Sequence, residues 1–214
     1  MLNLVHNLKS LFFSDKCPIC QKETDGNHYI CNSCYLNLLK KASLKNINNY
    51  YYIYIYENEI KKVIADFKLN FRKNISVELA SLIKKHLLYI IELHEIDIII
   101  PVPISKKRLK ERGFNQVEEI LKSCNIKYSC IYRQKDTKHM YQILNAKKRE
   151  KNITNAFKNK NLNFNNKNIL IVDDIVTTGA TTQEIIKEIY KNHTPTNIFI
   201  FSIALSKTFI YLHN

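Results

Sequence analysis

The sequence predicts an α/β domain, built on an open, mostly parallel sheet flanked by helices, behind a small N-terminal module of four cysteines. Downstream of Tyr50, apolar and β-branched segments alternate with segments whose apolar residues recur at helical spacing, as in a parallel sheet with crossover helices. Two strand segments, 96–102 and 168–173, are nearly uninterrupted apolar runs, which is typical of strands buried on both faces. The four cysteines fall ahead of this pattern, between positions 17 and 34.

The predicted elements divide the chain into two parts. Strands are expected at 50–56, 96–102, 126–132, 168–173 and 197–204, and helices at 59–67, 77–91, 106–122 and 181–190. Residues 135–166 are polar and lysine-rich, and loops of that length in compact domains are usually functional or disordered. We expect an N-terminal helix and cysteine module over residues 1–45 and a larger domain over residues 46–214.

The chain has a large positive charge for its size. Its 214 residues carry a formal net charge of +14, and the sequence pI is about 9.4. Such an excess favours polyanionic partners: nucleic acid, an anionic membrane face or phosphate-rich small molecules. Lysine- and asparagine-rich stretches such as 158–167 also fit solvated loops, so the charge indicates only a class of partner.

The N-terminal segment does not resemble a signal peptide or a membrane span. No apolar run reaches the roughly 18 to 20 residues that cross a bilayer, and residues 1–13 lack a charged lead-in and a cleavage site. We therefore expect a cytoplasmic protein. Leu4, Val5, Leu8 and Phe12 recur at helical spacing, which predicts an amphipathic helix that packs on the protein itself. Peripheral contact with the inner face of the membrane is the alternative.

Two Cys-x-x-Cys pairs predict a structural zinc site. Cys17 and Cys20 form the first pair, and Cys31 and Cys34 form the second, ten residues further on. Four thiolates complete a tetrahedral shell, which suits zinc and stabilises a segment too small to bury a core of its own. Two disulfides or a redox pair are the alternatives, although a cytoplasmic chain keeps disulfides reduced.

The segment from Ile169 to Thr182 predicts a site for a phosphorylated sugar. A buried strand ends in Asp173 and Asp174, and a threonine- and glycine-rich loop then opens a helix. Amides at a helix N-terminus favour a phosphate, and paired carboxylates suit vicinal hydroxyls or a magnesium ion carried by the ligand. The expected phosphate loop consists of Thr177, Thr178, Gly179, Ala180 and Thr181. The alternative is a strand whose Asp-Asp end only forms a turn and caps the helix.

This segment closely resembles the phosphoribosyl-diphosphate motif of type I phosphoribosyltransferases. The resemblance implies a type I phosphoribosyltransferase-like fold in which the two acids hold the ribose hydroxyls and the loop holds the 5′-phosphate. Magnesium would accompany the ligand. Enzymes of that family that act on 6-oxopurines have an aspartate base where this chain has Thr177, so the resemblance does not extend to that substrate class.

A second segment, Pro101 to Gln116, resembles the hallmark of the ComF/GntX family, competence-associated proteins of the DNA-uptake machinery. The four-cysteine module and the stretches 149–152 and 156–157 also fit that family, so the likeness covers nearly the whole chain. It implies a turn for the diphosphate beside the acid pair, although a basic solvated helix face is the alternative. The residues expected in this turn are Val102, Pro103, Ile104, Ser105, Lys106, Arg108 and Arg112.

The resemblance implies a competence protein of natural transformation that binds phosphoribosyl diphosphate and handles incoming single-stranded DNA, with proteins of the uptake machinery as partners. A phosphoribosyltransferase of nucleotide salvage and a non-catalytic basic DNA-binding protein are the alternatives. Lys68 lacks the glycine that commonly follows it in the family, and Thr137 and Gln142 are spaced irregularly. These departures concern a loop that could cover the pocket, so no catalytic residue is assigned. Tyrosines in 50–56 would stack on bases or fill the core.

Overall fold

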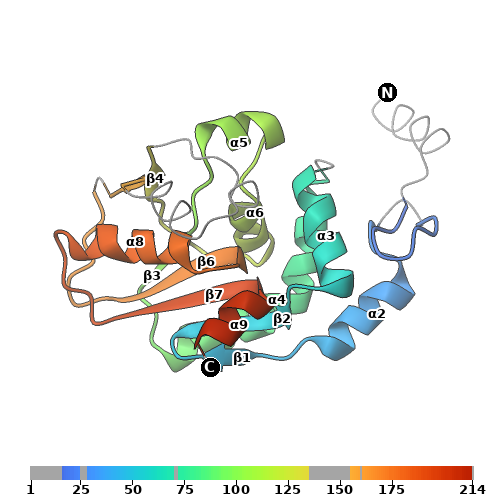
Figure 1. The fold of residues 1–214 in the computed structure, drawn as a ribbon, viewed down its shortest axis with the longest axis horizontal. Helices are drawn as coiled ribbons and strands as arrows, with labels where there is room; N and C mark the ends of the chain where they lie inside the picture. Colours follow the sequence, from blue (N-terminus) through green and yellow to red (C-terminus); the bar gives the residue numbers. More distant parts are fainter. Residues whose placement is uncertain (1–15, 25–27, 70–71, 135–154, 160, 214) are drawn as a thin grey trace.

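The computed structural model describes residues 16–24, 28–69, 72–134, 155–159 and 161–213. Its centre is a five-stranded sheet with strand order β1-β2-β7-β6-β3 (Figure 1). The predicted stretches 1–13 and 149–152, together with Thr137 and Gln142, lie outside the described residues.

The sheet is parallel except at one edge. Strands β2, β7, β6 and β3 pair in parallel, and β1 adds to β2 in the antiparallel sense. A separate two-stranded sheet joins β4 and β5. The strands are β1 (Lys45–Ile47), β2 (Tyr50–Ile55), β3 (Ile98–Pro101), β4 (Tyr132–Arg133), β5 (Phe157–Lys158), β6 (Asn168–Val176) and β7 (Asn197–Leu205). This arrangement confirms the predicted open, mostly parallel sheet.

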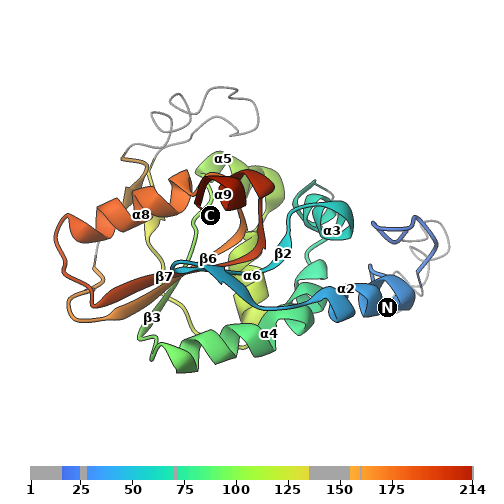
Figure 2. The same cartoon turned by 60° about the horizontal axis from the view of Figure 1, so that its bottom comes forward.

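Helices cover both faces of the sheet (Figure 2). They are α2 (Asn32–Lys41), α3 (Asn58–Leu69), α4 (Ile75–Leu93), α5 (Lys106–Arg112), α6 (Gln116–Ser123), α8 (Ala180–Tyr190) and α9 (Lys207–His213). Helices α3, α4 and α6 form one buried cluster with the sheet, and α8 and α9 form the other. Alternation along β6 builds both clusters, because Leu170 and Val172 face the first whereas Ile169 and Ile171 face the second.

The helix expected over 106–122 is two helices in the structure, so that prediction was wrong in its continuity. Gly113 ends α5 in the left-handed conformation, with φ of 78°. Asn115 then caps α6, because its side-chain oxygen accepts a hydrogen bond from the Val117 amide at 3.1 Å. The apolar period continues across the break, which is why the sequence pattern did not reveal it.

The strand expected over 126–132 is also mostly absent. Only Tyr132 and Arg133 form a strand, and they pair with β5 rather than with the main sheet. One backbone hydrogen bond, from the Ser129 amide to the Ile99 carbonyl at 2.8 Å, links this segment to β3. The apolar side chains of the segment pack onto the two clusters without a regular ladder. Within the described ranges, none of the helices has the length and apolar character needed to span a bilayer.

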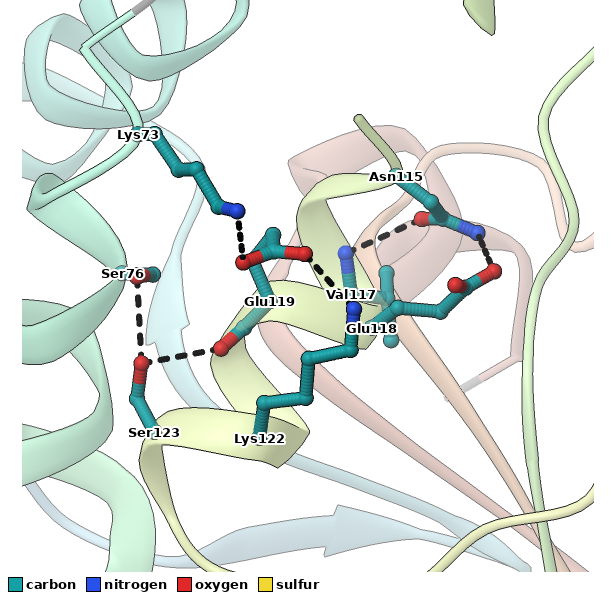
Figure 3. Close-up of polar contacts among 8 residues, drawn as sticks. All are labelled: Lys73, Ser76, Asn115, Val117, Glu118, Glu119, Lys122 and Ser123. Atoms are coloured by element: carbon teal, nitrogen blue, oxygen red, sulfur yellow. Dashed lines mark hydrogen bonds and ion pairs between the residues drawn. The ribbon is translucent and has the colours of Figure 1, made fainter. Parts of the chain in front are cut away.

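A polar cluster joins α4 to α6 (Figure 3). The Ser76 and Ser123 hydroxyls are 3.1 Å apart, and Ser123 also donates to the Glu119 carbonyl at 2.9 Å. The Glu119 carboxylate forms ion pairs of 2.9 Å with Lys73 and Lys122. These contacts hold α6 against α4 and so fix the position of the turn that precedes α6.

Candidate functional site

The carboxyl ends of the parallel strands meet at one edge of the sheet, and a cavity of about 380 Å³ opens there. Ligands of open α/β sheets bind at this edge. Register places Pro101 of β3 beside Val172 of β6, so the turn after β3 lies next to the acid pair. The lining includes Tyr56, Lys68, Val102, Pro103, Ile104, Arg108, Arg112, Gln116, Arg133, Asp173, Asp174, Thr177 and Thr181.

The two acids have different environments. Asp173 is half-buried, and its Oδ1 accepts a hydrogen bond from the Asp174 amide at 2.8 Å. Burial, and then the neighbouring Asp174 carboxylate, raise the pKa of Asp173 to about 7. Asp174 is buried and pairs with the Lys68 ammonium, whose nitrogen lies 2.8 Å from Oδ1. The pair therefore combines one carboxyl that titrates near neutral pH with one carboxylate held by a cation.

The loop after β6 has the conformation of a phosphate cradle. Gly179 adopts φ of 75° immediately before α8, and Asp173 and residues 175–182 line a small hollow of about 20 Å³. The Thr182 hydroxyl donates to the Gly179 carbonyl at 2.8 Å. The first residues of α8, an 11-residue helix, are among those that line the hollow, and a helix N-terminus is a favourable setting for an anion.

Helix α9 braces this loop from behind. The Ser206 hydroxyl donates to the Thr177 carbonyl at 2.6 Å, and the Phe209 ring packs behind Gly179. A Cβ added to Gly179 would come within 2.8 Å of that ring. Tyr50 of β2 contributes a hydroxyl 3.1 Å from that of Thr182. These contacts fix one side of the loop, and Thr177 and Thr181 line the cavity.

The turn after β3 supplies cations to the cavity, but not with every residue expected. Val102, Pro103, Ile104, Arg108 and Arg112 line the cavity. Arg112 also donates to the Gln116 side-chain oxygen at 3.0 Å. Ser105 is buried and caps α5 by accepting from the Arg108 amide at 3.3 Å. Lys106 is exposed and is not among the lining residues.

Asn115 ties this turn to α6. Its amide nitrogen donates to the Val102 carbonyl at 3.1 Å and to the Glu118 carboxylate at 2.9 Å. Figure 3 shows Asn115 facing Glu118 and Val117 at the start of α6. One buried side chain thereby sets both the turn and the first residues of α6, two of which face the cavity.

Several lining residues were not assigned to the site from the sequence, among them the polar residues Tyr56, Lys68, Gln116 and Arg133. Lys68 lies in the last turn of α3, 106 positions before its partner Asp174, and no local pattern connects the two. Arg133 lies over the Phe157 ring, with its guanidinium carbon 5.4 Å from the ring centroid. The resemblance singled out Lys68 and Gln116 as motif positions, which was the available signal for them.

The four cysteines come together as expected. Their sulfur atoms all lie within 4.8 Å of one another, and those of Cys20 and Cys31 are 3.6 Å apart. A tetrahedral zinc shell with Zn–S bonds of about 2.3 Å requires sulfur separations of about 3.8 Å. The cluster could therefore hold a zinc ion. A hydrogen bond with the Ser33 hydroxyl, and then one with the Cys34 backbone, lower the pKa of Cys31 to about 6, which favours the thiolate that metals bind.

The cysteine module docks on α3 and α4. Cys17 is fully buried within the larger core cluster, together with Ile30. The Ile30 amide donates to the Glu78 carboxylate at 2.9 Å, and Lys62 donates to the Ile19 carbonyl at 3.0 Å. The module is therefore continuous with the packing of the main domain.

A larger cavity of about 690 Å³ lies between the module and α4. Glu23 and Glu78 are among its lining residues, and carboxylates there would repel a phosphorylated ligand. Size alone would favour the cavity beside the cysteine module as the ligand site. Charge and the convergence of motifs favour the smaller cavity at the sheet edge.

We predict that Asp173→Asn makes folding less sensitive to pH. Asp173 binds its proton more tightly in the folded chain, so its contribution destabilises the fold as pH rises from about 4 to 7. Urea unfolding should show a gain for the variant that is about 1–2 kcal/mol larger at pH 8 than at pH 5. In the control Asp97→Asn the variant should instead lose stability by nearly the same amount at pH 5 and pH 8, because hydrogen bonds from the Asn168 amide and Lys167 lower the pKa of Asp97 and both pH values lie above the ordinary pKa of an aspartate. A gain that does not change with pH would contradict the prediction.

Gly179→Ala should destabilise the chain by about 1–3 kcal/mol, because Ala disfavours positive φ and its Cβ meets Phe209. In a Phe209→Leu background the added Cβ no longer meets the aromatic ring, but alanine still has to adopt a positive φ. The loss of folding stability caused by Gly179→Ala should therefore be smaller in that background than in the wild type. Thermal unfolding of the four proteins measures this coupling. Equal penalties in both backgrounds would mean that Phe209 does not press on the loop.

Metal analysis of protein purified without chelator should find about one zinc per chain. Cys20→Ser and Cys34→Ser should each lose the metal and lower the melting temperature, since the module has little core besides the cluster. Cys130→Ser is the matched control, because Cys130 is exposed and is not one of the clustered cysteines. Wild-type protein without metal, yet with an unchanged melting temperature after chelation, would refute a structural zinc.

Comparison with known proteins identifies relatives of the chain. No protein-family model matches the sequence. DNA utilization protein YhgH of Shigella flexneri is 27% identical over 185 residues, which are 82% of this chain and 78% of the relative. Competence protein ComFC of Bacillus subtilis is 26% identical over 179 residues, which are 77% of this chain and 67% of the relative. Among solved structures, adenine phosphoribosyltransferase from Saccharomyces cerevisiae is 14% identical with a TM-score of 0.43, covering 84% of this chain and 91% of that chain. The sequence relatives confirm the predicted resemblance: the chain is a homologue of DNA utilization protein YhgH and competence protein ComFC.

Proposed function

We propose that this chain is a competence protein that binds phosphoribosyl diphosphate with magnesium at the sheet edge and handles incoming single-stranded DNA. The observation that carries the proposal is the convergence, in one cavity of about 380 Å³, of an acid pair, two threonines of the loop 177–181, and the α5 arginines Arg108 and Arg112. Each group matches a different part of this ligand.

The fit can be followed group by group. The loop 177–181 would take the 5′-phosphate through backbone amides and hydroxyls. Asp173 and Asp174 would accept hydrogen bonds from the ribose hydroxyls. Arg108 and Arg112 would grip the diphosphate with two-pronged hydrogen bonds. Magnesium bound with the ligand would neutralise part of the diphosphate charge.

Transfer chemistry would use the same arrangement. The bond between ribose C1 and the diphosphate oxygen would break, the diphosphate would leave with the electron pair, and a nitrogen nucleophile would bond to C1. The arginines would stabilise the departing charge. A salvage phosphoribosyltransferase is the outcome to be expected if a nucleobase acts as that nucleophile.

The DNA part of the proposal draws on charge and on the names of the relatives. The net charge of +14 favours a phosphate backbone, and Lys106 and Lys110 expose ammonium groups on α5 near the cavity. In this role the chain would act in the cytoplasm with proteins of the DNA-uptake machinery, and peripheral contact with the inner membrane face is the alternative location.

Calorimetry tests the ligand directly. Wild-type protein should bind phosphoribosyl diphosphate in the presence of magnesium, and Asp173→Asn with Asp174→Asn should weaken binding by about 100-fold, since two charged acceptors are lost. Asp97→Asn is a matched control, because Asp97 lies where β3 and β6 begin, at the opposite edge of the sheet. Equal binding by the wild type and the double variant would contradict the assigned site.

Transformation and turnover assays separate the alternatives. Cells carrying the double variant should lose DNA uptake while the protein keeps its zinc and stays folded. Turnover of the ligand with a panel of nucleobases would instead indicate a salvage enzyme. DNA affinity that falls steeply with salt and survives the double substitution, without any binding of the sugar, would indicate a basic DNA-binding protein.

A further inference from the structure

Lys68 is a cation of the cavity that is paired with an acid of the site. Its ammonium lies 2.8 Å from Asp174 Oδ1, and the two side chains are 23% and 10% exposed. Arg108 and Arg112 line the same cavity from the opposite element, α5. The cavity therefore contains cations from both α3 and α5. One of them, Lys68, neutralises Asp174.

A ligand that enters with magnesium would add positive charge near the Asp174 carboxylate. A ribose hydroxyl is neutral and can hydrogen-bond to Asp174 while the ion pair persists. A magnesium ion carries two positive charges, and an ammonium held on the same carboxylate would repel it. Lysine is a compact charge on a flexible stem, so it can exchange one anionic partner for another within reach. A diphosphate in the cavity would be such a partner.

We propose that Lys68 is a specificity residue that pairs with Asp174 in the free protein and transfers its ammonium to the diphosphate when ligand and magnesium enter. Lys68 thereby makes the site selective for ribose that carries a 1-diphosphate together with its 5-phosphate. This inference rests on the proposed function, because it concerns the same cavity.

The pairing gives Lys68 two opposite effects on binding. It stabilises the acids while the cavity is free of ligand, because Asp174 would otherwise be a buried carboxylate without a cation at 2.8 Å. It also keeps a positive charge beside the cavity, which opposes the approach of magnesium bound with the ligand. When the Lys68–Asp174 ion pair breaks, a diphosphate offers the Lys68 ammonium a new anionic partner. Ribose 5-phosphate has no anionic group at C1 and offers none. Selectivity therefore comes from the exchange of partners and not from the ribose itself.

The test compares phosphoribosyl diphosphate with ribose 5-phosphate by calorimetry in magnesium. Lys68→Gln should weaken the first ligand by about 10-fold or more, the size of one charge-assisted contact, and change the second by less than about 3-fold. Lys68→Arg keeps the charge and should retain most of the selectivity. Lys61→Gln is a matched control, because Lys61 is an exposed lysine on the same helix.

Lys68→Gln leaves Asp174 without its cation and could fail to fold. A second pair of variants therefore tests the role of Lys68 without leaving that carboxylate unpaired. Asp174→Asn should keep a preference for the diphosphate, since Lys68 remains, and Asp174→Asn with Lys68→Gln should lose it. If wild-type protein binds both ligands and Lys68→Gln weakens both equally or neither, Lys68 has no specificity role and the proposed function stands. If wild-type protein binds neither ligand, the proposed function fails and this inference fails with it.

Discussion

The structure depends on the parallel pairing of β3 with β6, which places Pro101 beside Val172. Both strands are buried on two faces, so this register is fixed by apolar side chains rather than by the polar residues that follow them. Two turns that are far apart in the sequence consequently open at the same sheet edge, one rich in arginine and one beginning with two aspartates. Each turn is braced from behind, the first by Asn115 and the second by Ser206 and Phe209.

Charge distribution explains why this edge, and not the larger cavity beside the cysteine module, is the candidate site. The acids are set apart by their surroundings, since Asp173 has a raised pKa whereas Asp174 is held by Lys68. Cations from α3 and α5 line the cavity, and the hollow that adjoins it is lined by the first residues of α8. The positive and negative side chains of this cavity offset one another. The Lys68–Asp174 ion pair can be replaced by contacts with a ligand that has both anionic groups and hydroxyls. Paired acids facing arginines are otherwise a costly arrangement to bury.

The sequence predicted what depends on local pattern. The two apolar strands, the acid pair, the threonine- and glycine-rich loop and the cysteine spacing could all be recognised because each lies within a short segment. It did not predict the break at Gly113, since the apolar period runs through it, nor the loss of a strand over most of 126–132, where tertiary packing replaces a ladder. Lys68 and Arg133 were not assigned because they reach the cavity through the fold, and Ser105 and Lys106 were expected there because a run of polar residues does not reveal which side chains point inward.

The most direct test of this account is a crystal structure of the zinc-loaded protein with magnesium and phosphoribosyl diphosphate, at pH 8 where Asp173 is ionised. If the sheet edge is the ligand site, electron density for the 5-phosphate should lie against the amides around Gly179, and density for the ribose should lie against Asp173 and Asp174. Density for the ligand in the cavity beside the cysteine module, or ordered crystals soaked at saturating ligand with the sheet edge unchanged, would contradict it.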